Sequence, residues 1–467
     1  MGDEDTKPQP PRRPTRRRFL RDGALALGAL CAGSACARTP ILKEGILMAR
    51  GNRKPNLLFL MSDQLSIDAI AAHGCADVRT PNLDRLARRG VTFMESYSTN
   101  PLCSPARSSH VTGRMPVETS VVTNMGVIDP RLPNLGQWFG EAGYESIYCG
   151  KWHIPFVFQM DIPGFTVLPA GPHQADLSDA IVSRSCQTYF LNRSRRKPFM
   201  MVASLSQPHD ICGLTLRNLN LVPEDMPFAG IADRLPTLAP NHGLILPGPK
   251  KLRPMRLKLS EIQWRYYNYI YYRMVEMLDA DVGRILDALE DSGEAGNTLI
   301  LFSSDHGESR GRHGLCAKWH SYDEAAKVPL IVSWPRHIPE GRRDETHLVS
   351  GLDAMPTFCD FAGVTPPPLP HARSLRPLLE EKPVEWRDYI VFETQFTGRT
   401  VRTAQYKYVD YSDDPVKQLF DMKADPWETR NLYDETRRGA VIEEHRRLLK
   451  EWESRLEPSK RAMSPNA

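Results

Sequence analysis

The alternation of apolar and polar segments is the feature that most constrains the fold of this chain. Short apolar runs recur, each is followed within a few residues by a polar side chain, and helical patterns separate them. The runs predict buried strands over residues 55–61, 144–149, 198–205, 297–303 and 328–334. Strands that are apolar on both faces lie inside parallel sheets. We therefore predict an α/β fold with a doubly wound, mostly parallel sheet.

Polar residues after these strands predict the position of the functional site. Asp63, Lys151, His209 and Asp305 each stand just beyond a predicted strand. In an open parallel sheet, ligands bind in the crevice outside the carboxyl ends of the strands. We expect these four side chains to converge there.

The pattern changes near residue 385, which predicts a second, smaller domain. We predict a catalytic α/β domain over residues 52–376 and a C-terminal α+β subdomain, with an antiparallel sheet and a helix, over residues 377–458. The helices expected in the first domain begin at Thr80-Pro81 or span 132–142 and 257–291. The second domain is expected to contain strands 389–394, 399–404 and 406–411 and a helix over 440–456.

The N-terminal residues predict an export signal. Residues 1–37 contain a twin-arginine pattern at Thr15–Arg21, an apolar stretch too short to span a bilayer, and a small-residue cleavage site at Ala35-Cys36-Ala37. We expect export by the twin-arginine (Tat) translocase to the periplasm or the extracellular space. Cys31 or Cys36 offers lipid anchoring as an alternative, but no convincing lipobox precedes either residue.

Charge and cysteine usage exclude several classes of protein. The formal net charge is +4, and much of the basic excess lies in the first 21 residues. The remainder is close to neutral, so we expect no nucleic-acid surface. Two of the nine cysteines would be lost with the signal, and the remaining seven are an odd number, widely spaced and without a Cys-x-x-Cys pair. This pattern is typical neither of a disulfide framework nor of a zinc site.

Cys103-Ser104-Pro105-Ala106-Arg107 is the motif most informative about function. Other short motifs stand in order around it, namely Ser62–Gln64, Thr80–Asp84, Gly150–His153, Pro208-His209, Ser304–Gly307, Lys318 and Leu419–Leu432. With these motifs, residues 54–434 resemble the formylglycine-dependent, Cys-type sulfatase family of the alkaline-phosphatase-like superfamily. The resemblance implies that a formylglycine-generating enzyme oxidises Cys103 to formylglycine.

The chemistry of sulfate esters explains why such a residue would be needed. An aldehyde hydrates to a geminal diol, and one hydroxyl can attack sulfur to form a covalent enzyme sulfate. The second hydroxyl, once deprotonated, restores the aldehyde and expels sulfate by breaking the carbon–oxygen bond. A plain serine or cysteine would need water to attack at sulfur instead. The alternative interpretation of Cys103, a buried thiol with no chemistry, is less consistent with the neighbouring Pro105 and Arg107.

The resemblance also implies one divalent cation. Its implied ligands are Asp63, Gln64, modified Cys103, Asp305 and His306, and the expected ion is calcium, with magnesium or manganese as alternatives. Many sulfatases have an aspartate where this chain has Gln64. An amide oxygen can coordinate a cation, but one negative charge is missing, so ligation by Gln64 stays open.

The remaining implied catalytic residues are mostly cationic. The full set is Cys103, Arg107, Lys151, His153, His209 and Lys318. Arg107 would hold the modified side chain, and the two lysines would neutralise negative charge on the sulfate and on the leaving oxygen. His153 is the expected base for the second diol hydroxyl, and His209 the expected donor to the leaving oxygen, a task that Lys318 could share. His313, His320 and Glu324 lie near this set in sequence, where a structural role is at least as plausible.

Two other functions remain open. Related enzymes hydrolyse phosphonate monoesters or phosphodiesters with the same modified residue, and some share an Asp-Gln pair like Asp63-Gln64. A non-catalytic binding protein on this scaffold is disfavoured by the complete residue set. Within sulfatases, a carbohydrate or aryl ester is the expected substrate. The loops 154–180 and 210–256 and part of the C-terminal subdomain would set specificity. The basic bias of residues 210–256 could favour an anionic polysaccharide, but a solvated loop of mixed charge is the preferred interpretation.

Overall fold

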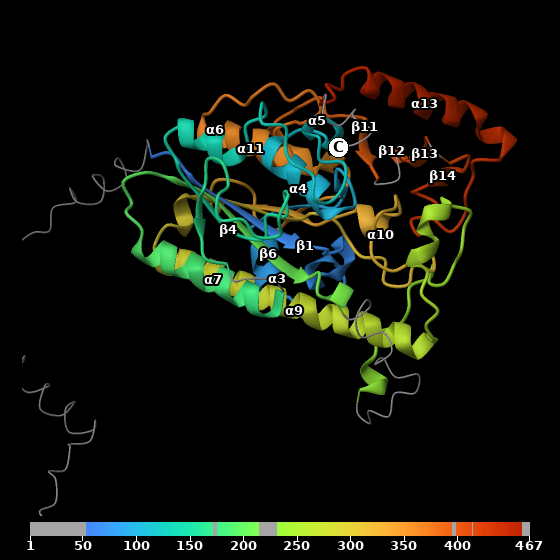
Figure 1. The fold of residues 1–467 in the computed structure, drawn as a ribbon, viewed down its shortest axis with the longest axis horizontal. Helices are drawn as coiled ribbons and strands as arrows, with labels where there is room; N and C mark the ends of the chain where they lie inside the picture. Colours follow the sequence, from blue (N-terminus) through green and yellow to red (C-terminus); the bar gives the residue numbers. More distant parts are fainter. Residues whose placement is uncertain (1–52, 171–174, 214–230, 395–397, 413, 460–467) are drawn as a thin grey trace, which may run out of the picture. The chain divides into compact units, whose positions relative to one another are not determined.

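An eight-stranded sheet forms the centre of the computed structural model (Figure 1). The model describes residues 53–170, 175–213, 231–394, 398–412 and 414–459, so the predicted signal peptide lies outside the described residues. In spatial order the strands are β5 (Thr166–Leu168), β4 (Glu145–Gly150), β6 (Phe199–Pro208), β1 (Asn56–Asp63), β7 (Thr298–Ser304), β8 (Leu330–Ser333), β2 (Gly90–Phe93) and β9 (Arg342–Asp344).

Most neighbouring strands of this sheet run parallel. The five strands from β5 to β7 are parallel to one another, and the central strand β1 pairs with β6 on one side and β7 on the other. Strand β8 is antiparallel to both β7 and β2. The predicted doubly wound, mostly parallel α/β sheet is confirmed.

Helices cover both faces of the sheet (Figure 1). Helices α3 (Pro81–Arg88), α7 (Ala175–Asn192) and α9 (Glu261–Asp291) lie on one face, and α4 (Cys103–Thr112), α6 (Leu135–Glu141) and α11 (Ala354–Ala362) lie on the other. Strand β1 shows why both faces are apolar. Leu58 and Leu60 enter one core, whereas Leu57 and Phe59 enter the opposite core, because successive side chains of a strand point to opposite faces.

Side-chain caps set the starts of two helices. Ser260 accepts a hydrogen bond from the backbone N–H of Gln263 at the start of α9, and Asn134 does the same with Gln137 at the start of α6. Both pairs form capping boxes, which satisfy backbone donors at a helix N-terminus. The predicted starts at residues 257 and 132 were therefore too early.

A four-stranded antiparallel sheet follows in the C-terminal part. Its order is β11 (Tyr389–Glu393), β12 (Gly398–Thr403), β13 (Tyr406–Tyr411) and β14 (Lys417–Asp421), and α13 (Gly439–Glu453) packs on it. The smaller C-terminal α+β subdomain is confirmed, with β14 as a strand that the sequence had not predicted. The domain boundary after residue 376 stays a prediction. The remaining strands and α-helices of the described residues are short, namely β3 (Ser96–Tyr97), β10 (Val349–Ser350), α5 (Pro116–Thr119), α10 (Asp323–Ala326) and α12 (Arg376–Leu379), and they are accompanied by several 3-10 turns.

A buried lysine links the small sheet to the segment between β7 and β8. Lys407 of β13 is fully buried, and its Nζ lies 2.7 Å from Asp323 Oδ1 and 2.5 Å from Glu428 Oε1. Its Nζ also donates to the carbonyl oxygen of Ser321. This ion pair therefore connects β13 to the segment that leads into α10.

Replacing this lysine is expected to destabilise the protein strongly. Lys407→Met should lower the free energy of unfolding by about 3–5 kcal/mol, because the buried carboxylate of Glu428 and the partly buried carboxylate of Asp323 lose their cation. Lys417→Met is the matched control, since the partly exposed Lys417 pairs only with Asp410 among the described carboxylates. It should change stability by about 1 kcal/mol or less. Urea unfolding followed by circular dichroism measures both, and equal effects would contradict the prediction.

No helix among the described residues combines the length and apolarity needed to cross a membrane.

Candidate active site

The polar residues that follow four neighbouring strands converge at one edge of the large sheet. Asp63 is the last residue of β1, Lys151 follows β4, His209 follows β6, and Asp305 follows β7. These strands are adjacent in the order β4-β6-β1-β7. The edge is the carboxyl edge of the parallel strands, where the strand pattern placed the site.

Cys103 is the first residue of α4 and faces this edge. Its Sγ lies 3.1 Å from His306 Nε2, 3.4 Å from Lys318 Nζ and 3.8 Å from Asp63 Oδ1. The side chain is 1% exposed. The N-terminus of a helix carries partial positive charge. Together with Lys318, it makes this position favourable for negative charge on residue 103 or on a bound anion.

Arg107 lies one turn further along α4 and ties the strand ends together. Its Nε donates to Asp305 Oδ2 over 2.8 Å, and its Nη2 donates to Asp63 Oδ2 over 3.0 Å. Its Nη1 donates to the Lys151 carbonyl and to Ser204 Oγ, each over 2.8 Å. The guanidinium of Arg107 thus binds the carboxylates of Asp63 and Asp305. The predicted direct hold of Arg107 on the modified residue 103 stays a prediction.

Four side chains form a cluster that suits a cation. Ligand atoms of Asp63, Cys103, Asp305 and His306 all lie within 4.8 Å of one another, and all four residues are buried. Two carboxylates and an imidazole are suitable ligands for a divalent ion. The Cys103 thiol stands here for the oxygen that formylglycine would present. His306 Nδ1 lies 2.9 Å from the carbonyl oxygen of Gly307, an arrangement that leaves Nε2 to face the cluster.

The surrounding charges shift the pKa values of Asp63 and Asp305 in opposite directions. Burial alone would raise the pKa of Asp63, but Lys151, His209, Arg107 and Lys318 hold that pKa well below its usual range. The pKa of Asp305 is raised instead, by burial and by the negative charge of Asp63. Asp63 therefore carries its charge more readily than Asp305 before any cation is bound.

The predicted cationic and basic residues surround the cluster. Lys151 Nζ lies 2.6 Å from Asp63 Oδ2. His209 follows a cis peptide bond between Gln207 and Pro208, and burial together with Lys151 and Lys318 lowers the pKa of His209 to about 4.

His153 lies beside the start of α4. Its carbonyl oxygen accepts a hydrogen bond of 2.5 Å from Ser104 Oγ. Its Nδ1 is buried and has no hydrogen-bond partner within the described part of the chain. The structure thus brings His153 close to the residue that follows Cys103, with one ring nitrogen available.

Gln64 is held by protein groups on both ends of its amide. Its Oε1 accepts a 2.5 Å hydrogen bond from Lys318 Nζ, and its Nε2 donates over 2.5 Å to Glu308 Oε2. Its backbone N–H donates to Asp305 Oδ1 over 3.0 Å, and its φ of 70° lies in the left-handed region. Ligation of a metal by Gln64 stays a prediction.

Glu308 is a buried residue of this site that the sequence interpretation missed. Besides the bond from Gln64, its Oε1 accepts hydrogen bonds from Tyr267 Oη over 3.0 Å and from the Ala317 N–H over 2.6 Å. It places a carboxylate behind Gln64, which itself lacks the negative charge common at that position. The missing charge at Gln64 and a glutamate two residues after His306 were the available signals.

Glu308 is expected to act by positioning Gln64 and Lys318. Glu308→Ala should lower kcat/KM by about 10–100-fold, the usual cost of losing a residue that orients a site's primary groups. Glu308→Gln keeps the acceptor oxygen toward Tyr267 and should recover part of the loss, which a merely space-filling role would not predict. The exposed Glu340 provides the control Glu340→Ala. Steady-state kinetics at matched thermal stability measure the effect, and full activity of Glu308→Ala would contradict it.

His313, His320 and Glu324 lie outside the four-residue cluster. The His313 ring stacks on Tyr322 with centroids 3.7 Å apart, and His320 Nε2 lies 2.7 Å from Ser309 Oγ. Tyr322 also packs on Phe420 of β14. These contacts favour a structural role between the two sheets.

Two protein-family models match this chain. The sulfatase family model matches residues 55–364, and the model for the C-terminal region of N-sulphoglucosamine sulphohydrolase matches residues 311–455. The chain belongs to the sulfatase family. This sulfatase is accordingly a sulfuric ester hydrolase with the alkaline-phosphatase-like fold.

Relatives of this sulfatase are similar over most of their length. It is 30% identical to a Delta 4,5-hexuronate-2-O-sulfatase of Bacteroides thetaiotaomicron, over 90% of this chain and 93% of the relative. A solved structure of a 2-O GAG sulfatase matches with a TM-score of 0.75 and 26% identity, covering 87% of this chain and 95% of that one. The phosphonate monoester hydrolase of Agrobacterium radiobacter shares the fold, with a TM-score of 0.71 and 24% identity over 86% and 96%.

Proposed function

We propose that this sulfatase hydrolyses the sulfate ester of a saccharide to an alcohol and inorganic sulfate, using a formylglycine hydrate formed from Cys103 and one divalent cation. The position of Cys103 carries the proposal. It begins a buried helix and lies within contact distance of His306, Lys318 and Asp63. A buried thiol without chemistry would have no need of two carboxylates, an imidazole and an ammonium around it.

The donor set fits a cation that prefers oxygen. Asp63, Asp305, His306 and the oxygen at residue 103 would hold it, and the amide oxygen of Gln64 is a further candidate. When bound, the cation would supply positive charge that draws electron density from the sulfate oxygens. We propose calcium because carboxylate and carbonyl oxygens predominate, with magnesium or manganese as alternatives.

The protein groups have separate tasks in this proposal. Arg107 holds Asp63 and Asp305 in place through its two-sided contact. Lys151 and Lys318 balance negative charge on the sulfate. His209 donates a proton to the leaving oxygen once the bound anionic ester raises the pKa of this histidine from about 4, with Lys318 as a second donor, and His153 removes the proton of the second hydroxyl at residue 103. The available ring nitrogen of His153 supports its assignment.

The two sulfatase relatives described above favour a saccharide over an aryl sulfate. The hexuronate-2-O-sulfatase and the 2-O GAG sulfatase both act, by their names, on sulfated sugars. The phosphonate monoester hydrolase shares only the fold, yet it keeps a phosphorus ester as the second candidate substrate.

Paired esters of one alcohol distinguish the two chemistries. The holoenzyme is assayed with 4-nitrophenyl sulfate, 4-nitrophenyl phenylphosphonate and bis(4-nitrophenyl) phosphate, alongside 2-O-sulfated hexuronate and 6-O-sulfated glucosamine. We expect the largest kcat/KM for a sulfated sugar. A larger kcat/KM for the phosphonate or the phosphodiester than for every sulfate would overturn the proposal in favour of the second candidate.

We also propose the predicted export route for this enzyme. The leader over residues 1–37 would direct the folded chain through the Tat translocase to the periplasm or beyond, after a formylglycine-generating enzyme has modified Cys103. Detergent partitioning of the processed protein tests the lipid-anchored alternative, because a lipidated form would enter the detergent phase.

A further inference from the structure

A large cavity lies between the segment that precedes Cys103 and the C-terminal subdomain. We call it the β11–α13 cavity. Its volume is about 770 Å³, and its lining includes Asn100, Thr123, Glu393, Thr394, Arg399 and Lys450. The volume lies within the usual range for small-molecule sites.

Two hydrogen bonds and the course of the chain connect this cavity to the start of α4. Asn100 stands three residues before Cys103, and the Glu393 N–H donates to the Thr99 carbonyl over 2.8 Å. Thr123 precedes Asn124, whose Oδ1 accepts the Ser104 N–H at the start of α4 over 3.0 Å. Residues on both sides of the cavity are thus within a few residues or one hydrogen bond of the N-terminus of α4, where the sulfate ester would be cleaved, although the lining itself includes none of the catalytic residues.

Three polar lining residues have an atom without a hydrogen-bond partner in the described part of the chain. The atoms are Asn100 Oδ1, Glu393 Oε1 and Thr394 Oγ1, and their residues are 1%, 7% and 5% exposed. Leaving such a group buried and unsatisfied costs about 1–3 kcal/mol. A cluster of them along one cavity is explained if a ligand rich in hydroxyl groups supplies the missing partners.

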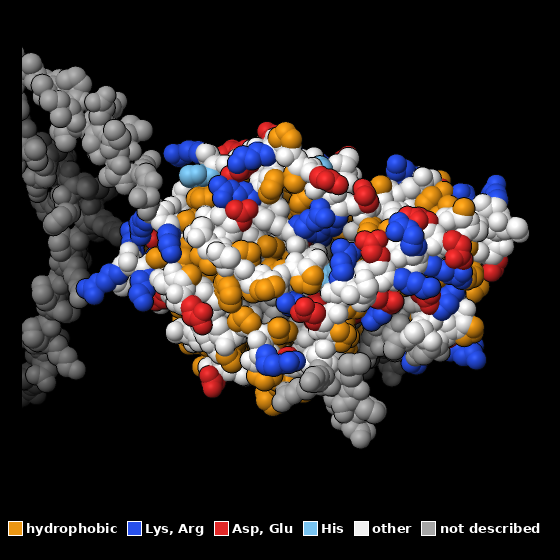
Figure 2. Space-filling view, turned by 90° about the horizontal axis from the view of Figure 1, so that it is seen from above, with side chains coloured by type: hydrophobic (Ala, Val, Ile, Leu, Met, Phe, Trp, Pro, Cys, Tyr) orange, Lys and Arg blue, Asp and Glu red, His pale blue; other side chains and the backbone are white. Residues whose placement is uncertain are grey.

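The cavity lining contains three cations, Arg399, Arg446 and Lys450, and three carboxylates, Glu393, Asp410 and Glu453. Arg399 pairs with Glu453 over 2.5 Å, and its Nε lies 3.9 Å from Glu393 Oε1. Lys450 of α13 forms no ion pair with any residue that the structure describes. Figure 2 shows the face that carries α13, where Lys and Arg side chains intermingle with Asp and Glu toward the right-hand end. Lys450 could therefore pair with an anionic group of the ligand, because it forms no ion pair with any described carboxylate.

We propose that the β11–α13 cavity holds the sugar of the substrate, that Glu393 and Thr394 determine specificity by hydrogen bonding to its hydroxyl groups, and that Lys450 receives a second anionic group such as a uronate carboxylate. This inference rests on the proposed saccharide sulfatase activity and names its substrate class as an anionic sugar. The scissile sulfate would lie at Cys103, and the ring would extend past Asn100.

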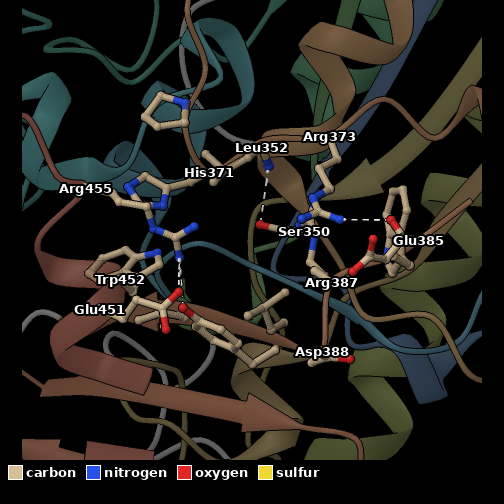
Figure 3. Close-up of a pocket in the computed structure, with 15 residues that line it drawn as sticks. Ser350, Leu352, His371, Arg373, Glu385, Arg387, Asp388, Glu451, Trp452 and Arg455 are labelled. Carbon is tan, nitrogen blue, oxygen red and sulfur yellow. Dashed lines mark hydrogen bonds and ion pairs between the residues drawn. The ribbon is translucent and has the colours of Figure 1, made fainter. Parts of the chain in front are cut away.

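A second cavity differs from the β11–α13 cavity because its arginine side chains already form ion pairs or hydrogen bonds within the protein. It has a volume of about 230 Å³ and lies between the segment before β11 and the end of α13 (Figure 3). Arg387 pairs with Asp353 over 2.7 Å, Arg455 donates to Tyr389 Oη over 2.8 Å, and Arg373 donates to the Glu385 carbonyl over 3.2 Å. This cavity supplies the matched control, Arg373→Ala.

The test compares saccharide and aryl substrates in variants of the two cavities. Wild type, Glu393→Ala, Glu393→Gln, Thr394→Val and Arg373→Ala are assayed with 4-nitrophenyl sulfate and with the 2-O-sulfated hexuronate or 6-O-sulfated glucosamine that wild type cleaves best. We expect Glu393→Ala to raise KM for the sugar at least about tenfold, with a smaller change in kcat. Glu393→Gln, which keeps a polar amide, should recover most of the loss, and Arg373→Ala should match wild type.

The role of the positive charge of Lys450 is tested with a separate variant. Lys450→Ala should raise KM for the sulfated hexuronate several-fold more than KM for the sulfated glucosamine, which lacks the carboxylate. Equal KM changes for both sugars would overturn the assignment of Lys450.

The outcomes separate this inference from the function on which it rests. A folded Glu393→Ala variant with an unchanged KM for the sugar, or with equal KM increases for sugar and aryl ester, overturns the inference alone. Wild type that cleaves 4-nitrophenyl sulfate but no sulfated sugar overturns it as well. Wild type that cleaves no sulfate ester overturns the proposed function and the inference together. Thermal unfolding of each variant shows whether it is folded.

Discussion

Cys103→Ala should lower kcat by at least about 1,000-fold, because the variant has no side chain that can attack sulfur. The fold should persist, since the substitution removes a single sulfur atom from the start of α4. Activity toward the best sulfate ester measures the loss, and thermal unfolding measures the fold. Cys75→Ala is the control, because Cys75 is a partly exposed free thiol outside the four-residue cluster.

The chemical state of residue 103 is read from the same preparation. The tryptic peptide Gly90–Arg107 of the wild type should be lighter than its sequence mass, because an aldehyde oxygen replaces the sulfur and two hydrogens are lost. An active enzyme whose peptide carries an intact thiol, made in a host that modifies other sulfatases, would contradict the formylglycine mechanism. It would leave a hydrolase that depends on the metal and the thiol alone.

Removal of the divalent cation should reduce activity to background and lower thermal stability. Without a cation, Arg107 contacts both Asp63 and Asp305, and Lys151 provides a further positive charge for Asp63 alone. A bound ion stabilises the folded state by about 2.7 kcal/mol when its concentration is 100 times its dissociation constant. Dialysis against a chelator, followed by addition of calcium, magnesium or manganese, measures the loss and shows which ion restores activity.

A ligand variant provides the control for metal removal. Asp305→Asn should unfold at a temperature that responds much less to added calcium than the unfolding temperature of wild type does. Full activity of chelator-treated wild type, with less than one metal ion per chain by elemental analysis, would contradict a metal-dependent mechanism.

The sequence predicted the strands well because burial on both faces leaves continuous apolar runs, as in β1 and β6. Helix α4 shows why other elements were missed. All ten of its residues are buried, so it lacks the alternation of apolar and polar faces that marks a surface helix. Strand β14 was missed in a similar way, because its polar residues Lys417 and Gln418 mask the short run that follows.

The candidate site was predicted residue by residue from motifs, but its connections were not. Arg107 was predicted as a catalytic residue, but its hydrogen-bond partners were not. The hydrogen bonds of Arg107 to Asp63 and Asp305 depend on the pairing of β1 with β7. The β11–α13 cavity brings Asn100 and Glu393 together from positions almost 300 residues apart. Such pairings arise from tertiary packing, which local patterns do not encode.

The burial of α4 sets an order of events in the life of the protein. A maturation enzyme that reads Cys103, Pro105 and Arg107 as one linear stretch needs them exposed, whereas the folded protein encloses all three and uses the Arg107 guanidinium to join strand ends. Under the formylglycine mechanism that we propose, oxidation of Cys103 would therefore have to precede the closing of the sheet over α4. With the export of a folded chain that we propose, the modification takes place in the cytoplasm, during or soon after synthesis. In a molecule that folds with its thiol intact, the maturation enzyme could not reach Cys103 until the protein unfolds.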